Sequence, residues 1–156
     1  MSTKKDISAG AVIVAAGLSS RMNAFKPMLP LAGSTVIRTL IGTLRIGGAG
    51  PIVVVTGRNG EELAEHIADL DIQTVHNEKF ATTDMFHSAC LGFQALAGQS
   101  ELIFFTPGDI PLFSPYSIGE MLEQMTEFCL DILTPTYNGH RGHPVLLSAA
   151  AADTLS

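Results

Sequence analysis

Charged residues are scarce in this chain, and basic ones do not predominate. Charged side chains make up 15% of the 156 residues against 46% apolar, which excludes a disordered tail and favours a compact domain. The formal net charge of −6 argues against nonspecific nucleic-acid binding, which needs a basic surface. We therefore expect no nucleic-acid partner, although a few cations in one cleft can still bind a small anion.

Long apolar runs are also absent. No stretch approaches the ~18 apolar residues of a membrane span, so we expect no membrane partner. Residues Met1–Asp6 contain lysines but no apolar stretch that ends at a small-residue cleavage site. We interpret Val12–Leu18 as a first strand with its loop and not as a signal peptide. The expected location is the cytoplasm.

Two further absences narrow the class of protein. The chain has only two cysteines, Cys90 and Cys129, which we interpret as buried free thiols and not as a disulfide or metal pair. It also lacks both Gly-x-x-x-x-Gly-Lys-Ser/Thr and Gly-x-Gly-x-x-Gly. P-loop and dinucleotide-binding assignments therefore fail at the level of the motif.

Apolar segments of strand length alternate with helical patterns along the chain. Their order predicts a largely parallel sheet with helices on both faces. Ligands of such sheets bind outside the carboxyl ends of the strands. The predicted strands are Ala9–Ala15, Ile52–Thr56, Ile72–His76, Leu102–Thr106, Asp131–Thr134 and Pro144–Leu147.

Four helices are predicted between these strands. In the third, Thr82 or Thr83 is the expected N-cap, and Met85 is expected in the core. The helices are predicted from Val36 to Leu44 before Gly47-Gly48, over Glu61–Leu70, from Met85 to Leu96, and from Ser114-Pro115 onward.

The most informative segment follows the first strand. The small-residue loop Ala16-Gly17-Leu18-Ser19-Ser20 is followed by Arg21 and, five residues later, by Lys26. Gly17 has no Cβ, so backbone N–H groups can approach a ligand closely and surround an anion. Arg21 adds a planar fork for phosphate oxygens, and Lys26 adds a movable point charge. Together they predict a site for a polyphosphate such as a nucleoside triphosphate.

This segment also carries a family resemblance. Ala15 to Met22, with Lys26 and Leu29-Pro30-Leu31-Ala32-Gly33, resembles the signature of the MobA-like nucleotidyltransferases. Within that family it is most similar to the molybdenum cofactor cytidylyltransferase branch. The resemblance implies a Rossmann-like three-layer α/β/α fold of the nucleotide-diphospho-sugar transferase type. It implies one domain over residues 1–156 that lacks the family's usual C-terminal portion, and nucleotide contacts from Ala15, Ala16, Gly17, Leu18, Ser19 and Ser20.

A second candidate region follows the strand at Leu102–Thr106. Asp109 stands there between Gly108 and Pro111, and a carboxylate at a strand end is a suitable ligand for Mg²⁺. The alternative is a turn aspartate that accepts from its own backbone. The residues resemble the family's Gly-Asp-x-Pro motif, and this resemblance assigns Asp109 to the metal.

Three more site residues rest on the resemblance. Asn77 matches the family asparagine near the nucleotide, and Ser88 matches the serine of a Gly-Met-x-x-Ser segment in which Asp84 replaces the usual glycine. His143, in Arg141–Pro144, matches a segment beside the second substrate and could steady a phosphate or pterin group. The alternatives are a turn residue for Asn77, a helix-dipole acid for Asp84 and a loop histidine for His143.

The implied reaction is nucleotidyl transfer from CTP or GTP to a molybdopterin-type cofactor, with release of pyrophosphate. Ala15-Ala16-Gly17 resembles the CTP-using branch. Arg21, Lys26 and Asp109 would be the catalytic residues and Mg²⁺ the cofactor, and a molybdoenzyme would receive the product. Two alternatives stay open: a related transferase that uses a sugar phosphate, phosphocholine or methylerythritol phosphate, and a non-catalytic nucleotide-binding domain.

Overall fold

The centre of the molecule is a sheet of six strands, in a computed structural model that describes residues 6–17 and 24–156. The strands are β1 (Ala9–Ala15), β4 (Ile52–Thr56), β5 (Gln73–His76), β6 (Leu102–Pro107), β7 (Ile132–Leu133) and β10 (Val145–Ser148). They lie in the order β5–β4–β1–β6–β10–β7. The pairs β5/β4, β4/β1 and β1/β6 are parallel, whereas β10 runs antiparallel to both of its neighbours.

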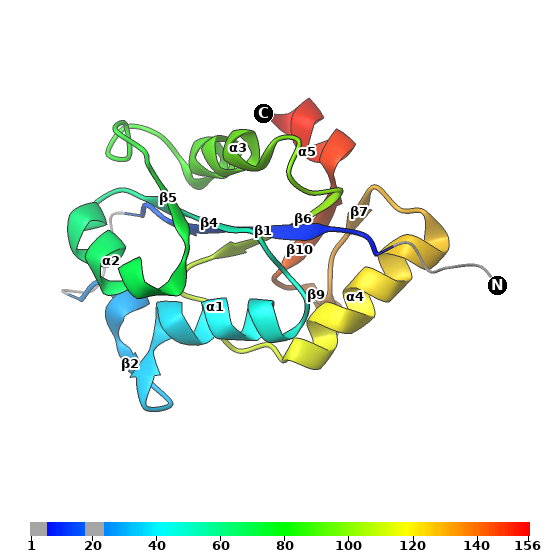
Figure 1. The fold of residues 1–156 in the computed structure, drawn as a ribbon, viewed down its shortest axis with the longest axis horizontal. Coiled ribbons are helices and arrows are strands. Elements are labelled where there is room, and N and C mark those ends of the chain that lie inside the picture. The colour runs from blue at the N-terminus through cyan, green and yellow to red at the C-terminus, as the bar shows by residue number, and fades with distance from the viewer. Residues whose placement is uncertain (1–5, 18–23) are drawn as a thin grey trace.

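Helices cover both faces of this sheet (Figure 1). On one face lie α1 (Val36–Ile46), α2 (Gly60–His66) and α4 (Pro115–Phe128), and on the other lie α3 (Met85–Leu96) and α5 (Ala149–Leu155). The predicted three-layer α/β/α class is therefore confirmed. The remaining elements are the 3-10 helices η1 (Lys26–Met28) and η2 (Ala68–Leu70), and the hairpins β2 (Pro30–Leu31) with β3 (Ser34–Thr35) and β8 (Thr136–Tyr137) with β9 (His140–Arg141).

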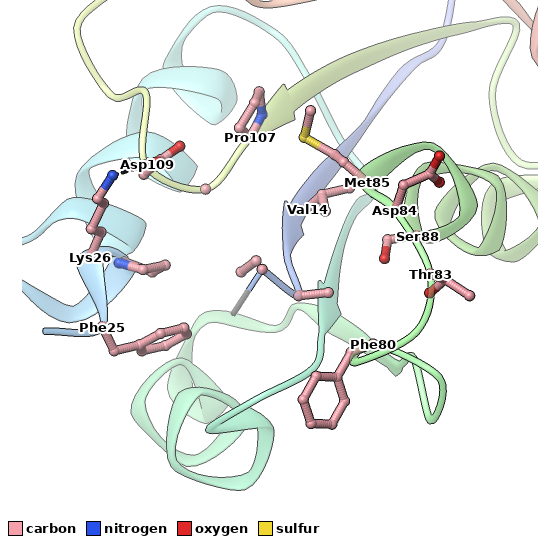
Figure 2. A pocket seen from close by; sticks show the side chains of 15 residues that line it. Val14, Phe25, Lys26, Phe80, Thr83, Asp84, Met85, Ser88, Pro107 and Asp109 are labelled. Carbon is pink, nitrogen blue, oxygen red and sulfur yellow. Dashed lines mark hydrogen bonds and ion pairs between the residues drawn. The ribbon is translucent and has the colours of Figure 1, made fainter. Parts of the chain in front are cut away.

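Strand β1 is buried on both faces, as its apolar run predicts. Ile13 packs among the residues under α1 and α4, whereas Val12 and Val14 pack under α3. β1 and β6 end at the same edge of the sheet, beside the pocket shown in Figure 2. None of the helices in residues 6–17 and 24–156 has the length and apolarity that a membrane crossing requires.

Several local predictions need correction. The predicted helix Glu61–Leu70 is two elements, α2 and η2, and Asp71 ends the second with a left-handed φ of 53°. Cys90 and Cys129 are free thiols, but neither is buried as predicted: Cys90 is half-buried, and Cys129 is exposed because it follows α4 as its left-handed C-cap. The antiparallel direction of β10 is not visible in the apolar pattern, which is the same for either direction.

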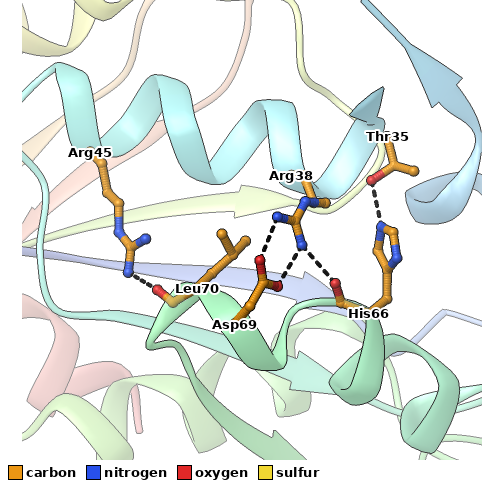
Figure 3. Close-up of polar contacts among 6 residues, drawn as sticks. All are labelled: Thr35, Arg38, Arg45, His66, Asp69 and Leu70. Carbon is orange, nitrogen blue, oxygen red and sulfur yellow. Dashed lines mark hydrogen bonds and ion pairs between the residues drawn. The ribbon is translucent and has the colours of Figure 1, made fainter. Parts of the chain in front are cut away.

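A polar cluster joins α1 to the segment α2–η2 (Figure 3). The Arg38 guanidinium donates to both carboxylate oxygens of Asp69, at 2.7 and 2.8 Å, and to the His66 carbonyl at 2.8 Å. Arg45 donates to the carbonyls of Leu70 and Asp71. Arginines of α1 thus satisfy carbonyl groups at the ends of the neighbouring helices, which no helical N–H group could reach.

We expect the Arg38–Asp69 pair to make the free energy of unfolding depend on pH in the acid range. Hydrogen bonds from Arg38 lower the pKa of Asp69 from 3.8 to about 2. The pair therefore stabilises the fold above pH 3.8, and this contribution is lost as the pH falls toward 2. In urea denaturation at neutral pH, Asp69→Asn should have a slightly lower free energy of unfolding than the wild type. This difference should become smaller as the pH falls from 3.8 toward 2. Asp153→Asn, at an exposed position, is the control, and a pH-independent deficit for Asp69→Asn would contradict the assignment.

We expect Gly92 to be required where α3 crosses the sheet. A Cβ at this position would overlap Val12 and lie 3.1 Å from Val55 Cγ2, and both valines are fixed in central strands. Gly92→Ala should therefore lower the free energy of unfolding by about 2 kcal/mol. Gly42→Ala in α1 is the matched control, because nothing lies within 4 Å of its added Cβ, and it should stabilise by about 0.5–1 kcal/mol. Equal stability of the two variants in urea would refute this packing account.

Candidate active site

The pocket lies where β1 and β6 end and α3 begins, and its volume is about 250 Å³ (Figure 2). This is the position at which open parallel sheets bind their ligands. It is lined by Val14, Ala15, Ala16, Gly17, Phe25, Lys26, Pro27, Phe80, Thr83, Asp84, Met85, Ser88, Pro107, Gly108 and Asp109. Segments far apart in the sequence therefore form one cavity.

The floor of the pocket is made of small residues held by the sheet. Gly108 N donates to the Val14 carbonyl at 2.8 Å, so the β1/β6 ladder continues past the last paired residues of the strands. A Cβ at Gly108 would lie 3.2 Å from the Ala15 Cβ, so glycine allows this close approach. Gly17 is exposed, and none of the atoms of residues 6–17 and 24–156, its chain neighbours aside, lies within 4 Å of where its Cβ would be.

One wall of the pocket carries charge. Lys26 Nζ lies 3.5 Å from Asp109 Oδ2, although the two residues are 83 positions apart. Their side chains are 41% and 40% exposed, so both remain accessible to a ligand. Lys26 comes from η1 and Asp109 from the loop after β6. The predicted cation and the predicted acid therefore meet at one wall of the pocket.

The opposite wall is formed by the start of α3 and includes Thr83, Asp84, Met85 and Ser88 (Figure 2). Asp84 is the N-cap, and its carboxylate accepts from the His87 N–H at 2.9 Å. The predicted cap at Thr82 or Thr83 is therefore wrong, because Asp84 is the residue next to the first helical turn. Met85 is 48% exposed and lines the pocket, so its predicted place in the core is also wrong.

Asn77 lies behind this wall and does not line the pocket. It is 1% exposed, and its Nδ2 group donates to Thr83 Oγ1 and to Ser88 Oγ, each at 3.0 Å. Its Oδ1 accepts from the Lys79 N–H at 2.9 Å. The structure thus places Ser88 at the pocket and Asn77 one layer further in.

His143 is outside the residues that line the pocket. Its ring packs edge-on against Phe105 with centroids 5.9 Å apart. Burial lowers the pKa of His143, while the Phe105 backbone and the charge of Asp109 act in the opposite direction. Lowering of the pKa favours the neutral imidazole, so any phosphate contact at this position would be a hydrogen bond more than a charge interaction.

Part of the predicted nucleotide-binding loop cannot be compared with the structure, and one residue that lines the pocket was not predicted. Leu18, Ser19, Ser20 and Arg21 lie outside the described residues, so their predicted roles stay predictions. Phe80 lines the pocket but was missed, since a single aromatic residue after Asn77 has no distinctive spacing. Within residues 6–17 and 24–156, no group of three or more His, Cys, Asp or Glu side chains could hold a metal by itself.

Comparison with known proteins agrees with this geometry. A family profile described as "MobA-like NTP transferase domain" matches residues 11–156. The molybdenum cofactor cytidylyltransferase of Escherichia coli is 33% identical over 138 residues, which cover 88% of this chain and 68% of that protein. The bifunctional protein GlmU of Geobacter sulfurreducens is 32% identical over 85% of this chain, but the match covers only 29% of GlmU.

Solved structures show the same fold. A nucleotidyl transferase from Methanothermobacter superposes with a TM-score of 0.81 at 25% identity, over 94% of this chain and 74% of its own. Rv0371c from Mycobacterium tuberculosis, solved as a complex with manganese, gives a TM-score of 0.78 at 19% identity, over 96% and 75% of the two chains. The predicted nucleotide-diphospho-sugar transferase fold and the predicted class, a nucleotidyltransferase domain, are confirmed. This chain belongs to the family of MobA-like NTP transferase domains.

Proposed function

We propose that this site transfers a nucleoside monophosphate from a nucleoside triphosphate, CTP in preference to GTP, to the phosphate of a molybdopterin-type cofactor and releases pyrophosphate. The observation that carries the proposal is the meeting of Lys26 and Asp109 beside the open backbone of Gly17. A cation and an acid beside an exposed glycine at one strand edge are groups that suit a polyphosphate with its metal ion.

The chemistry needs no nucleophile from the protein. The acceptor's phosphate oxygen attacks the α-phosphorus in line, its bond to phosphorus forms as the bond to pyrophosphate breaks, and the protein positions the groups and neutralises charge. Lys26 neutralises charge around the α-phosphate, while the Gly17 backbone and Arg21 hold the β- and γ-phosphates. A molybdoenzyme that receives the finished cofactor remains part of the proposal as a partner.

Asp109 is the residue that would hold a divalent cation, with Mg²⁺ proposed. The donor set fits this role, because Mg²⁺ is commonly held by one or two carboxylates and completes its shell with phosphate oxygens and water. Asp109 is exposed at the pocket, whereas Asp84 uses its carboxylate to cap α3. When bound, the metal supplies positive charge between the phosphates. Manganese in the Rv0371c complex supports a divalent metal for this fold.

The Lys26–Asp109 pair has to open when ligands bind. Exposed ion pairs contribute only about 0–1 kcal/mol, so phosphate and metal can replace the two partners at little cost. Phosphate would then neutralise Lys26, and Asp109 would hold the metal. Each residue exchanges one partner of opposite charge for another, so neither charge is left unpaired.

The reaction is tested by pyrophosphate release. The full chain, Mg²⁺, a molybdopterin-type acceptor and either CTP or GTP should give acceptor-dependent pyrophosphate, faster with CTP. The support for CTP is Ala15-Ala16-Gly17 and the similarity to the Escherichia coli cytidylyltransferase. A clear GTP preference would reject the base assignment. Release with a sugar phosphate, phosphocholine or methylerythritol phosphate instead would identify the related transferase, and nucleotide binding without release would identify a non-catalytic domain.

Lys26→Ala should distinguish the proposed role of Lys26 at the phosphate from the proposed role of Asp109 at the metal. Loss of one positioned cation at the reacting phosphate costs ~3 kcal/mol, so turnover should fall about a hundredfold. Binding of Mn²⁺ alone, followed by electron paramagnetic resonance, should instead tighten a few-fold because Lys26 no longer competes for Asp109. Asp109→Asn should lose Mn²⁺ binding. Arg58→Ala, at an exposed cation outside the pocket, should change neither value, and near wild-type turnover of Lys26→Ala would disprove its role.

A further inference from the structure

A short path of backbone hydrogen bonds joins Lys26 to the start of α1. The Leu29 N–H donates to the Lys26 carbonyl at 3.1 Å, and the Val36 N–H donates to the Leu29 carbonyl at 3.0 Å. Between these two bonds, Pro30 is paired with Thr35 in the hairpin β2–β3. A shift of Thr35 would therefore change the position of the backbone that carries Lys26.

The side chain of Thr35 contacts α2 and does not cap its own helix. Thr35 is the N-cap residue of α1, where a hydroxyl normally accepts from an N–H group of the first helical turn. It makes no such cap bond, and its Oγ1 lies instead 2.8 Å from Nε2 of His66 (Figure 3). His66 is the last residue of α2 and is half-buried. The hydroxyl thus joins the hairpin to α2.

The backbone of His66 is itself held in place. Its carbonyl accepts from Arg38 of α1 at 2.8 Å, and the same guanidinium donates to both carboxylate oxygens of Asp69, at 2.7 and 2.8 Å. Arg38 thus ties the end of α2 and η2 to α1. His66 therefore offers Thr35 a partner that is anchored outside the hairpin, as a supporting hydrogen bond for a functional side chain requires.

We propose that His66 is a positioning residue that, through Thr35, holds the segment carrying Lys26 in place for nucleotidyl transfer. This inference rests on the proposed function, in which Lys26 neutralises charge around the α-phosphate. Lys26 Nζ meets Asp109 only in an exposed ion pair of 3.5 Å, and such pairs are too weak to fix a side chain. The backbone of Lys26 has to be positioned by its own support. His66 does not line the pocket, so it acts without contact to the ligand.

Thr35→Val is the sharpest test, because valine keeps the shape of threonine and removes the hydroxyl. Packing of Pro27 and Met28 also holds η1, so the effect should be partial. In the pyrophosphate-release assay with the full chain, kcat should fall about three- to tenfold, as expected for one lost hydrogen bond. KM for CTP should stay unchanged, because Lys26 acts on charge that grows in the transition state. Amide hydrogen exchange should become faster at Leu29 and Val36 but not in β1.

Two variants of His66 and one of Arg45 are the controls. His66→Ala should reproduce the loss of kcat. His66→Gln should restore kcat to within about twofold of the wild type, because the glutamine amide can replace Nε2 as donor or acceptor. Arg45→Ala removes two bonds from α1 to carbonyls of the same interface without touching Thr35. It should leave kcat unchanged, which separates positioning from a general loss of stability.

The double variant shows whether the effect passes through Lys26. In the Lys26→Ala background, Thr35→Val should lower kcat no further. Unchanged kcat in Thr35→Val, an equal loss in Arg45→Ala, or an additive loss in the double variant would overturn the inference. A wild-type chain that releases no pyrophosphate with any acceptor would instead overturn the proposed function. Hydrogen exchange at Leu29 and Val36 would then decide alone whether Thr35 holds this segment.

Discussion

The parallel hydrogen-bond ladder of β5, β4, β1 and β6 is the constraint on which the site depends. It continues past the strands on both sides, through Gly108 N to the Val14 carbonyl and through Asn77 N to the Thr56 carbonyl, each at 2.8 Å. These two bonds fix the backbone from which the Asp109 loop and the Asn77 network start. The segments that carry Asn77 and Asp109 therefore begin at backbone that the buried centre of the sheet holds in place.

The two walls differ because different forces hold them. Lys26 and Asp109 meet in an exposed ion pair at 3.5 Å, which is weak and can exchange partners with a ligand. Thr83 and Ser88 are instead held by a buried amide through bonds of 3.0 Å, and such networks are costly to break inside a protein. The wall of Lys26 and Asp109 can thus change partners easily. The wall of Thr83 and Ser88 is held in one arrangement by Asn77.

Features that depend only on residue type and on spacing along the chain could be predicted from the sequence. The apolar runs locate the buried strands, and the pattern of glycine with a downstream lysine and aspartate predicted that Lys26 and Asp109 belong to one site, where the structure brings them together. Met85 and the cap at Asp84 were not predictable, because both depend on how α3 meets the pocket. The placement of Asn77 behind the wall also needed the structure, since a sequence does not state which side of a loop an amide faces. At position 77, burial and not residue type decides whether the side chain lines the pocket or only holds the residues that line it.

An acidic chain can bind a polyanion only if its own acids at the site are neutralised. The net charge is −6, and both Asp84 and Asp109 line the pocket. Asp84 turns its carboxylate to the His87 N–H at the positive end of α3, and Asp109 faces Lys26. Each acid therefore has a local partner, and neither presents an uncompensated charge to a phosphate. Under the proposed function, a phosphate that drew Lys26 away would leave Asp109 facing the same polyanion, and a divalent cation held by Asp109 would offset that repulsion.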